Sequence, residues 1–311
     1  MRTPSAAPPT ASGRRHLSDR QAAPASRRLG SGLLGLLLFV CLCSAATQGT
    51  AQDNSGPGEL PAISIIIDDL GYRRLDGLRA LELPGAVAYA VLPHTPYGTR
   101  LAAIAFQLDK EVLLHVPMES ELEKALGPGG LTNTMAQGEI RAVLDAGMAS
   151  IPHVMGINNH MGSALTQQTR TMGWLMDWMN DQGELYFVDS ITSARSVALR
   201  SASAAGLPAI GRDVFLDATA DAGMIAKQFD RLIALARERG TGLAIGHPYP
   251  ETLSVLRKVL VKPSYYGVQL VPVSELIARR ANGAHVQSIL PGQDNSNTAR
   301  YARNSVVVEK K

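Results

Sequence analysis

The chain has 311 residues, of which 45% are hydrophobic and 18% charged, and its formal net charge is +3 at pH 7. Residues 1–52 contain six arginines and one aspartate, so the rest of the chain carries a net charge of −2 and offers no basic surface for nucleic acids. Both cysteines, Cys41 and Cys43, lie in this N-terminal segment, which excludes disulfides, thiolate catalysis and cysteine-ligated zinc from the remainder.

The N-terminal segment has the layout of a secretory signal peptide. Arginines precede an apolar run at 33–43, and small residues follow it. The run is short for a membrane span, although an uncleaved anchor is the alternative. We therefore predict export to the periplasm or cell envelope, with no membrane span left after cleavage of the leader.

From residue 62 onward, short apolar runs alternate with segments of helical periodicity. The runs lie at 63–67, 87–92, 111–115, 153–158, 184–188, 209–215, 242–246 and 268–273. Apolar residues recur at spacings of three and four in the intervening segments 97–109, 137–150, 169–182, 221–239 and 251–261. Runs that are apolar on both faces, each followed by a helix, are typical of parallel strands with helical crossovers. The pattern predicts an α/β fold whose sheet is a barrel of about seven or eight mostly parallel strands, with a doubly wound open sheet as the alternative.

The predicted organisation has three parts. Residues 1–52 are the signal peptide and linker, residues 53–283 form one barrel domain, and residues 284–311 form a polar, flexible tail. No nucleotide or flavin motif occurs along the chain.

Ionisable residues follow the predicted strands at the point where each strand ends. In parallel β/α folds the carboxyl ends of the strands form one rim, and active sites are built there. The side chains expected at this rim are Asp68, Asp69, His94, His115, Asn159, His160, Asp189, Ser190, Arg212, Asp213, Asp217 and His247. We therefore expect one functional site at the carboxyl end of the barrel.

The first strand and its neighbours offer metal ligands. Adjacent residues on an extended strand point to opposite faces, so Asp68 and Asp69 are expected to divide two roles, a base and a cation ligand. The alternative is that one of them caps the next helix. His115, His160 and Glu119 add the imidazole and carboxylate groups that suit zinc, although a solvated Glu119 is equally compatible with the sequence.

Other rim residues are expected to act around the metal. His247 precedes a rigid Pro-Tyr-Pro turn and could act as a general acid, or simply pack on Tyr249. His94 lies beside a helix start, and either capping or a place in the site is compatible with the sequence. Asn158 or Asn159 could orient a ligand, and Arg212 is expected to neutralise the aspartates beside it. The residues expected to bind substrate or orient the site are Glu119, Asn159, Asp189, Arg212, Asp213 and Asp217.

Six segments resemble the divergent polysaccharide deacetylase family, a branch of the NodB-like carbohydrate esterases. They are IIIDDLG (65–71), LLHVPME (113–119), INNHMGS (157–163), YFVDS (186–190), RDVFLD (212–217) and AIGHPYPETL (244–253). The resemblance covers about residues 62–282. It implies a distorted, NodB-like (β/α) barrel and metal-dependent hydrolysis of an N-acetyl group on an amino sugar.

The resemblance also implies roles for individual residues. Asp68 matches the catalytic base, Asp69 the metal-binding aspartate and His115 the first metal-binding histidine of the family, while His247 matches its general acid. Glu119 stands where the ordinary deacetylases have a second histidine, and His160 could replace that ligand. The fourth-strand arginine motif of the ordinary enzymes is absent, with NNHMGS in its place.

The first functional hypothesis is an exported, zinc-dependent hydrolase that removes N-acetyl groups from an amino-sugar polymer such as peptidoglycan. The second is a catalytically silent metal- or glycan-binding envelope protein on the same fold, which Glu119 and the missing arginine favour. Asp68 and His247 favour the first. A third hypothesis is an envelope interaction protein whose rim residues are structural.

Overall fold

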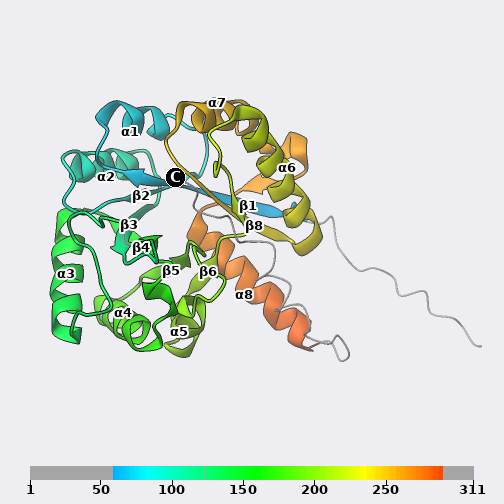
Figure 1. Ribbon diagram of the computed structural model, residues 1–311. Helices are drawn as coiled ribbons and strands as arrows, with labels where there is room; N and C mark the ends of the chain where they lie inside the picture. Colours follow the sequence, from blue (N-terminus) through cyan, green and yellow to red (C-terminus); the bar gives the residue numbers. More distant parts are fainter. Residues whose placement is uncertain (1–58, 123, 290–311) are drawn as a thin grey trace, which may run out of the picture. The chain divides into compact units, whose positions relative to one another are not determined.

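The computed structural model describes residues 59–122 and 124–289; the predicted leader (1–52) and the end of the predicted tail (290–311) lie outside the described residues. Strands and helices alternate along the chain (Figure 1). The strands are β1 (Ala62–Leu70), β2 (Ala88–Val91), β3 (Val112–Met118), β4 (Val154–Met161), β5 (Tyr186–Asp189), β6 (Ala209–Gly211), β7 (Val214–Phe215), β8 (Thr241–Gly246) and β9 (Gln269–Leu270). The α-helices are α1 (Arg74–Leu81), α2 (Gly98–Gln107), α3 (Gln137–Ser150), α4 (Thr169–Gln182), α5 (Ala198–Ala204), α6 (Ala222–Arg239), α7 (Pro250–Val259) and α8 (Val273–Ile289), and short 3-10 turns lie at Leu165–Gln167 and Pro263–Tyr266.

The sheet is parallel throughout and curls into a barrel. Its strand order is β6-β5-β4-β3-β2-β1-β8-β7, and β9 pairs with β1. β6 and β7 are the two ends of this order, yet only Arg212 and Asp213 separate them along the chain. The backbone N–H of Arg212 donates to Asp189 in β5 (3.0 Å), and that of Asp213 donates to Leu243 in β8 (2.9 Å). This dipeptide joins the two edges, which confirms the predicted distorted (β/α) barrel and excludes the open doubly wound sheet.

Three details differ from the sequence-based prediction. The apolar run 209–215 forms two strands at opposite edges of the sheet, because its polar dipeptide crosses the gap between them. Helices α5 and α8 were not among the predicted helical segments, and α1 was expected only as the helix that follows Asp69. Helix α8 continues to Ile289, past the predicted domain boundary at 283, although its sequence there is polar. Within the described ranges, no helix is both long and apolar enough to cross a membrane.

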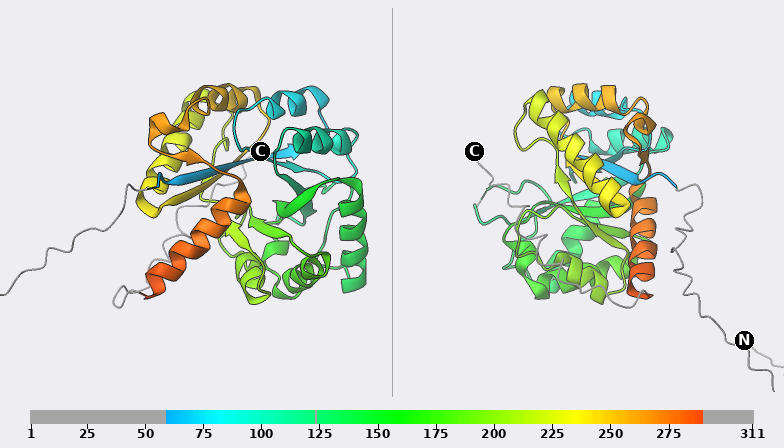
Figure 2. Two further views of the ribbon diagram at one scale, coloured as in Figure 1. Left: turned by 180° about the vertical axis from the view of Figure 1, so that it is seen from behind. Right: turned by 90° about the vertical axis from the view of Figure 1, so that its right-hand side faces the viewer.

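Both faces of the sheet are buried, which explains the continuous apolar runs. One hydrophobic cluster lies between the sheet and its helices and contains Ile63, Ile65 and Ile67 of β1. A second cluster fills the barrel interior and contains Ile66 of β1 and Leu113 of β3. Helix α8 packs on this interior cluster through Leu276 and Ile277, and Figure 2 shows it on one side of the barrel.

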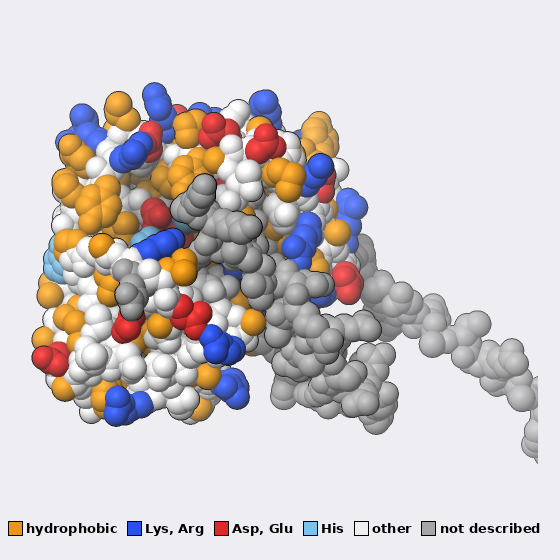
Figure 3. Space-filling view, in the orientation of Figure 1, with side chains coloured by type: hydrophobic (Ala, Val, Ile, Leu, Met, Phe, Trp, Pro, Cys, Tyr) orange, Lys and Arg blue, Asp and Glu red, His pale blue; other side chains and the backbone are white. Residues whose placement is uncertain are grey.

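Because side chains alternate between the two faces of a strand, polar residues at the strand ends face the interior at the mouth of the barrel. Successive residues face opposite sides, so a residue two positions beyond an interior core residue also faces the interior. The residues that occupy these positions are Asp68 after Ile66, His115 after Leu113, Ser190 after Val188, Arg212 after Ile210 and His247 after Ile245. Figure 3 shows acidic and histidine side chains close together on the face of the molecule seen there.

A buried carboxylate ties the other end of the barrel to α8. Glu111 directly precedes β3, and its Oε2 accepts hydrogen bonds from the Tyr186 hydroxyl (3.1 Å) and the Val273 backbone N–H (2.7 Å). Its Oε1 accepts from the Ser274 N–H at 3.2 Å. Val273 and Ser274 are the first residues of α8, whose N–H groups have no partner within the helix. Glu111 therefore caps α8 and bonds Tyr186 at the same time.

We expect Glu111→Ala to lower the free energy of unfolding by about 3 kcal/mol, because it leaves several buried donors without an acceptor. Urea unfolding followed by circular dichroism measures this. Glu275→Ala is the matched control: this glutamate lies in the first turn of the same helix, but its side chain is 44% exposed and pairs with Arg279. We expect a loss below about 1 kcal/mol there. Equal losses in the two variants would contradict the role assigned to Glu111.

Candidate metal centre

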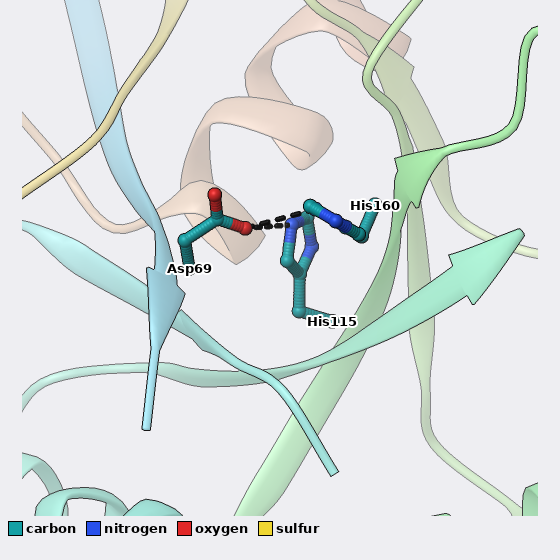
Figure 4. A group of neighbouring side chains, drawn as sticks. All are labelled: Asp69, His115 and His160. Atoms are coloured by element: carbon teal, nitrogen blue, oxygen red, sulfur yellow. Dashed lines mark ion pairs between the residues drawn. The ribbon is translucent and has the colours of Figure 1, made fainter. Parts of the chain in front are cut away.

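Three potential metal ligands meet at the mouth of the barrel. Asp69 comes from β1, His115 from β3 and His160 from β4 (Figure 4). Asp69 Oδ1 lies 3.2 Å from His115 Nε2 and 2.9 Å from His160 Nδ1. One ligand atom from each residue lies within 4.8 Å of the others. Within the described residues this is the one group with the composition and spread of a metal site.

A β-bulge brings both aspartates to this site. The pairing of β1 with β2 shifts register between Ile67 and Leu70, and Asp69 has a φ of +62°. Aspartate is among the residues that tolerate this left-handed conformation best. His115 Nε2 consequently lies 3.6 Å from Asp68 Oδ2 as well as 3.2 Å from Asp69 Oδ1. The expectation that the two carboxylates point to opposite faces is wrong, because the strand is not extended at Asp69. Neither aspartate caps α1, whose N-cap is Arg73.

Asn158 orients His115 from the neighbouring strand. The two residues are partners in the β3–β4 register, and His115 Nδ1 lies 2.7 Å from Asn158 Oδ1. The amide nitrogen of Asn158 donates to Asp68 Oδ1 at 2.8 Å. Since the amide group donates to the carboxylate, its oxygen accepts from the imidazole, and the proton of His115 resides on Nδ1. Nε2, which lies 3.2 Å from Asp69 Oδ1, is then the ring nitrogen left to bind a metal ion.

The trio fits a divalent cation. Asp69 Oδ1 is buried and accepts no hydrogen bond within the described residues, although two imidazole nitrogens lie beside it. Zinc bonds of 2.0–2.2 Å in tetrahedral geometry place neighbouring ligand atoms roughly 3.3 Å apart, close to the separations observed here. Burial acts to raise the pKa of Asp69, but the adjacent His115 and His160 outweigh it and hold the pKa well below its usual range. Two imidazoles and an ionised carboxylate form a ligand set that suits zinc.

His247 follows β8 and lies beside Asp69 at the candidate metal centre, where Asp217 holds its ring. Its Nδ1 lies 2.9 Å from Asp217 Oδ1, and its backbone N–H donates to Asp217 Oδ2 at 2.6 Å. The Thr252 hydroxyl also donates to Oδ2, at 2.7 Å. The free Nε2 of His247 lies 3.7 Å from Asp69 Oδ2, and the edge of the ring contacts Phe215. The imidazole is therefore fixed with one nitrogen facing the candidate metal centre.

Asp68 and His247, which flank the three candidate ligands, have pKa values that differ from those of exposed side chains. Burial raises the pKa of Asp68 and outweighs the opposing effect of His115 and His247. Burial acts to lower the pKa of His247, but its hydrogen bond with Asp217 and the charges of nearby aspartates outweigh it and raise the pKa to about 9. The site thus combines a carboxylate that accepts a proton more readily than usual with an imidazole that carries one at neutral pH.

Two predicted candidates lie outside the trio. Glu119 Oε2 accepts a hydrogen bond from the backbone N–H of Asn133 at 2.6 Å, so the side chain holds the loop after β3. His94 is exposed, and its backbone N–H donates to the Ser150 hydroxyl at 3.2 Å. The structure therefore does not bring Glu119 or His94 to the candidate metal centre.

Asn159 and Asp189 bind backbone and loop groups. Asn159 donates to the Met161 carbonyl (2.7 Å) and accepts from the Ser190 N–H (2.9 Å), so it links the ends of β4 and β5. Asp189 accepts from the Ile191 N–H at 2.8 Å and the Ser196 hydroxyl at 2.7 Å. Both residues hold the rim, and within the described residues no hydrogen bond or ion pair joins either side chain to the side chains of the three ligands.

Arg212 and Asp213 face opposite ends of the barrel. Arg212 donates to the carbonyls of Ser190 (2.7 Å) and Ile191 (2.9 Å), and burial lowers its pKa to about 10. Asp213 pairs with Arg280 of α8 at 2.6 Å. Arg212 does not form an ion pair with Asp213 or Asp217 within the described residues, but the charges of Asp189, Asp68 and Asp213 oppose the effect of burial on its pKa. Its neutralising role stays a prediction. The roles of Phe215 and Thr252 were not recognised from the sequence, because neither residue carries charge or metal-binding chemistry.

The chain is similar to a known protein family, to two bacterial proteins in sequence and to one solved structure in fold. Residues 65–277 match the family model described as divergent polysaccharide deacetylase. The uncharacterized protein YibQ of Escherichia coli K12 is 37% identical over 206 residues, which are 66% of this chain and 64% of that protein. An uncharacterized protein of Haemophilus influenzae Rd is 31% identical over 195 residues, covering 63% of this chain and 69% of that protein. The crystal structure of the uncharacterized protein ATU2773 of Agrobacterium tumefaciens C58 has a TM-score of 0.68 at 23% identity, covers 71% of this chain and 91% of that one, and shares its fold.

Proposed function

We propose that this chain, which belongs to the divergent polysaccharide deacetylase family, is an exported, metal-dependent hydrolase that removes N-acetyl groups from an amino-sugar polymer. The observation that carries the proposal is the grouping of Asp69, His115 and His160 at the barrel mouth, flanked by Asp68 and His247. Export and an envelope substrate such as peptidoglycan follow from the predicted signal peptide.

Asp69, His115 and His160 would hold the cation, and zinc is the favoured ion because of the ligand set. When bound, a divalent cation supplies Lewis-acid polarisation of the acetamide carbonyl. Asn158 keeps the Nε2 lone pair of His115 directed into the site through its bond to Nδ1. The backbone bulge at Asp69 keeps its carboxylate on the same side as the two imidazoles.

In the proposed mechanism Asp68 would act as the general base. Its Oδ1 is occupied by the Asn158 amide, whereas Oδ2 faces the trio, 3.6 Å from His115 Nε2. Hydrolysis of an acetamide requires a water molecule to lose a proton as its oxygen bonds to the carbonyl carbon, and Asp68 Oδ2 would accept that proton.

In the proposed mechanism His247 would act as the general acid. Asp217 holds Nδ1, which leaves Nε2 facing the site. As the C–N bond breaks, Nε2 would donate its proton to the sugar nitrogen. The products are a free amine and acetic acid, which ionises to acetate. The step leaves Asp68 protonated and His247 deprotonated, and exchange of protons with solvent would restore both groups.

Release of acetate tests the proposal. The purified, zinc-loaded chain is incubated with N-acetylglucosamine oligosaccharides and with peptidoglycan, and we expect acetate release that stops with a chelator and resumes with added zinc. Retention of metal without acetate release would instead support the catalytically silent binding protein. A chain that neither retains nor rebinds any divalent cation would rule out the metal-dependent mechanism.

A further inference from the structure

We infer that the candidate site continues into a row of three exposed tyrosines that binds successive rings of a sugar polymer, so that an oligosaccharide binds better than a single amino sugar. We call Tyr249, Tyr72 and Tyr97 the tyrosine row. The inference rests on the proposed function for its substrate class and adds the residues that select for chain length.

The tyrosine row follows three adjacent strands. Tyr249 comes after β8, Tyr72 after β1 and Tyr97 after β2, and these strands are consecutive in the sheet. The residues are 43%, 50% and 38% exposed, respectively. All three lie at the carboxyl rim, where Asp69 and His247 also lie. The row therefore occupies one continuous part of the mouth of the barrel.

Two contacts connect the tyrosine row to the candidate site. The Tyr249 ring stacks on the His247 ring, with centroids 5.4 Å apart and an angle of 29° between the planes. The Tyr97 backbone N–H donates to the carbonyl of Gly71, the residue before Tyr72, at 3.0 Å. Gly71 in turn lies two residues after Asp69. The row thus begins at the proposed general acid and extends past the metal ligand of β1.

Apart from the stacking of Tyr249 on His247, no hydrogen bond or ring contact within the described residues engages these three side chains. Within residues 59–122 and 124–289, no hydrogen bond engages their hydroxyl groups, whereas the buried Tyr89 and Tyr186 donate to Ala80 and Glu111. Tyr97 and Tyr249 stand at the N-caps of α2 and α7 without a side-chain capping bond. Their rings and hydroxyls are therefore available to a ligand.

The chemistry of the row fits a carbohydrate. A pyranose ring presents C–H groups on its face and hydroxyls at its edge, and tyrosine offers an apolar ring with a polar tip at a low cost in side-chain entropy. Neighbouring strands lie about 4.8 Å apart, so the row spans about 10 Å at the strand ends. One sugar ring held at the metal centre cannot reach all three side chains, and a polymer can.

Binding to a turnover-deficient variant tests the inference. Zinc-loaded Asp68→Asn chain is titrated calorimetrically with N-acetylglucosamine and with its β-linked hexasaccharide. We expect the hexasaccharide to bind more tightly than the single sugar. Tyr72→Ala and Tyr97→Ala, each added to this background, should weaken hexasaccharide binding by roughly 2- to 12-fold and leave binding of the single sugar unchanged. Tyr72→Phe should retain most of the affinity, since it keeps the ring.

Tyr265→Ala is the matched control. Tyr265 is 78% exposed but lies in the 3-10 turn before β9, which pairs with the start of β1 at the opposite end of the barrel. We expect it to leave both affinities unchanged. Equal affinities for the two sugars, absence of hexasaccharide binding, or equal effects of the Tyr72 and Tyr265 variants would overturn the inference. Because binding is measured without turnover, a wild-type chain that releases no acetate yet shows the tyrosine-dependent binding would refute only the proposed function.

Discussion

Asp69→Asn, His115→Ala and His160→Ala are each expected to abolish stoichiometric zinc binding while the barrel stays folded. Each substitution leaves two of the three protein ligands, and protein zinc sites use at least three. The loss of affinity should exceed the roughly 100-fold typical of residues that only orient a ligand. Asparagine is used at position 69 because it tolerates the φ of +62°, whereas alanine would add backbone strain. Elemental analysis of the purified variants and competition with a zinc chelator measure the effect.

Two neighbouring asparagines provide the internal comparison. Asn158→Ala removes the group that fixes His115 and should weaken zinc binding by roughly 10- to 100-fold. Asn159→Ala should leave zinc affinity unchanged, because its side chain bonds to Met161 and Ser190 instead. Full zinc occupancy in all three ligand variants, measured in chains with wild-type melting temperatures, would refute the metal centre.

Asp68→Asn and His247→Gln are expected to lower kcat by roughly 10²- to 10⁴-fold each, the range for general acid–base groups, while zinc is retained. Asparagine at position 68 can still bond to the Asn158 amide through its oxygen, but it cannot take a proton from water. Glutamine at position 247 keeps polar contact with Asp217 and removes the proton donor. Initial rates of acetate release, with zinc content determined on the same samples, separate a lost proton transfer from a lost metal.

Variants of Asp217 and Asp213, both in the segment 212–217, test whether an aspartate positions His247 or only stabilises the fold. Asp217→Asn should lower kcat, because Asp217 holds the ring of His247 and stabilises its protonated form, whereas Asp213→Asn should leave kcat unchanged. The Asp213 carboxylate pairs with Arg280 and accepts from the Leu243 N–H at the other end of the barrel, so its loss should appear in thermal stability. Unchanged turnover in the Asp68 and His247 variants would exclude the proposed proton transfers.

The sequence predicted the barrel and the end of it where the candidate metal centre lies, because both follow from local periodicity. Strands buried on both faces must be apolar along their length, and polar residues mark their ends. The two-residue period then assigns Asp68, His115 and His247 to the interior side of the barrel mouth, two positions beyond Ile66, Leu113 and Ile245. The run 209–215 misled the prediction, since its polar dipeptide crosses between two edges of the sheet.

Which of several neighbouring residues contacts the candidate metal centre depended on the tertiary structure. Register between β3 and β4 places Asn158, and not Asn159, opposite His115, and a single-residue shift would exchange them. A bulge formed by the pairing of β1 with β2 turns Asp69 toward the imidazoles, which no local pattern encodes. The hydrogen bond to the Asn133 backbone directs Glu119 away from the candidate metal centre.

By itself, the sequence determined which strand ends carry ionisable side chains, because burial and periodicity are local properties. Only the tertiary structure decided which side chains meet, because register, bulges and barrel closure arise from contacts between residues far apart in the chain.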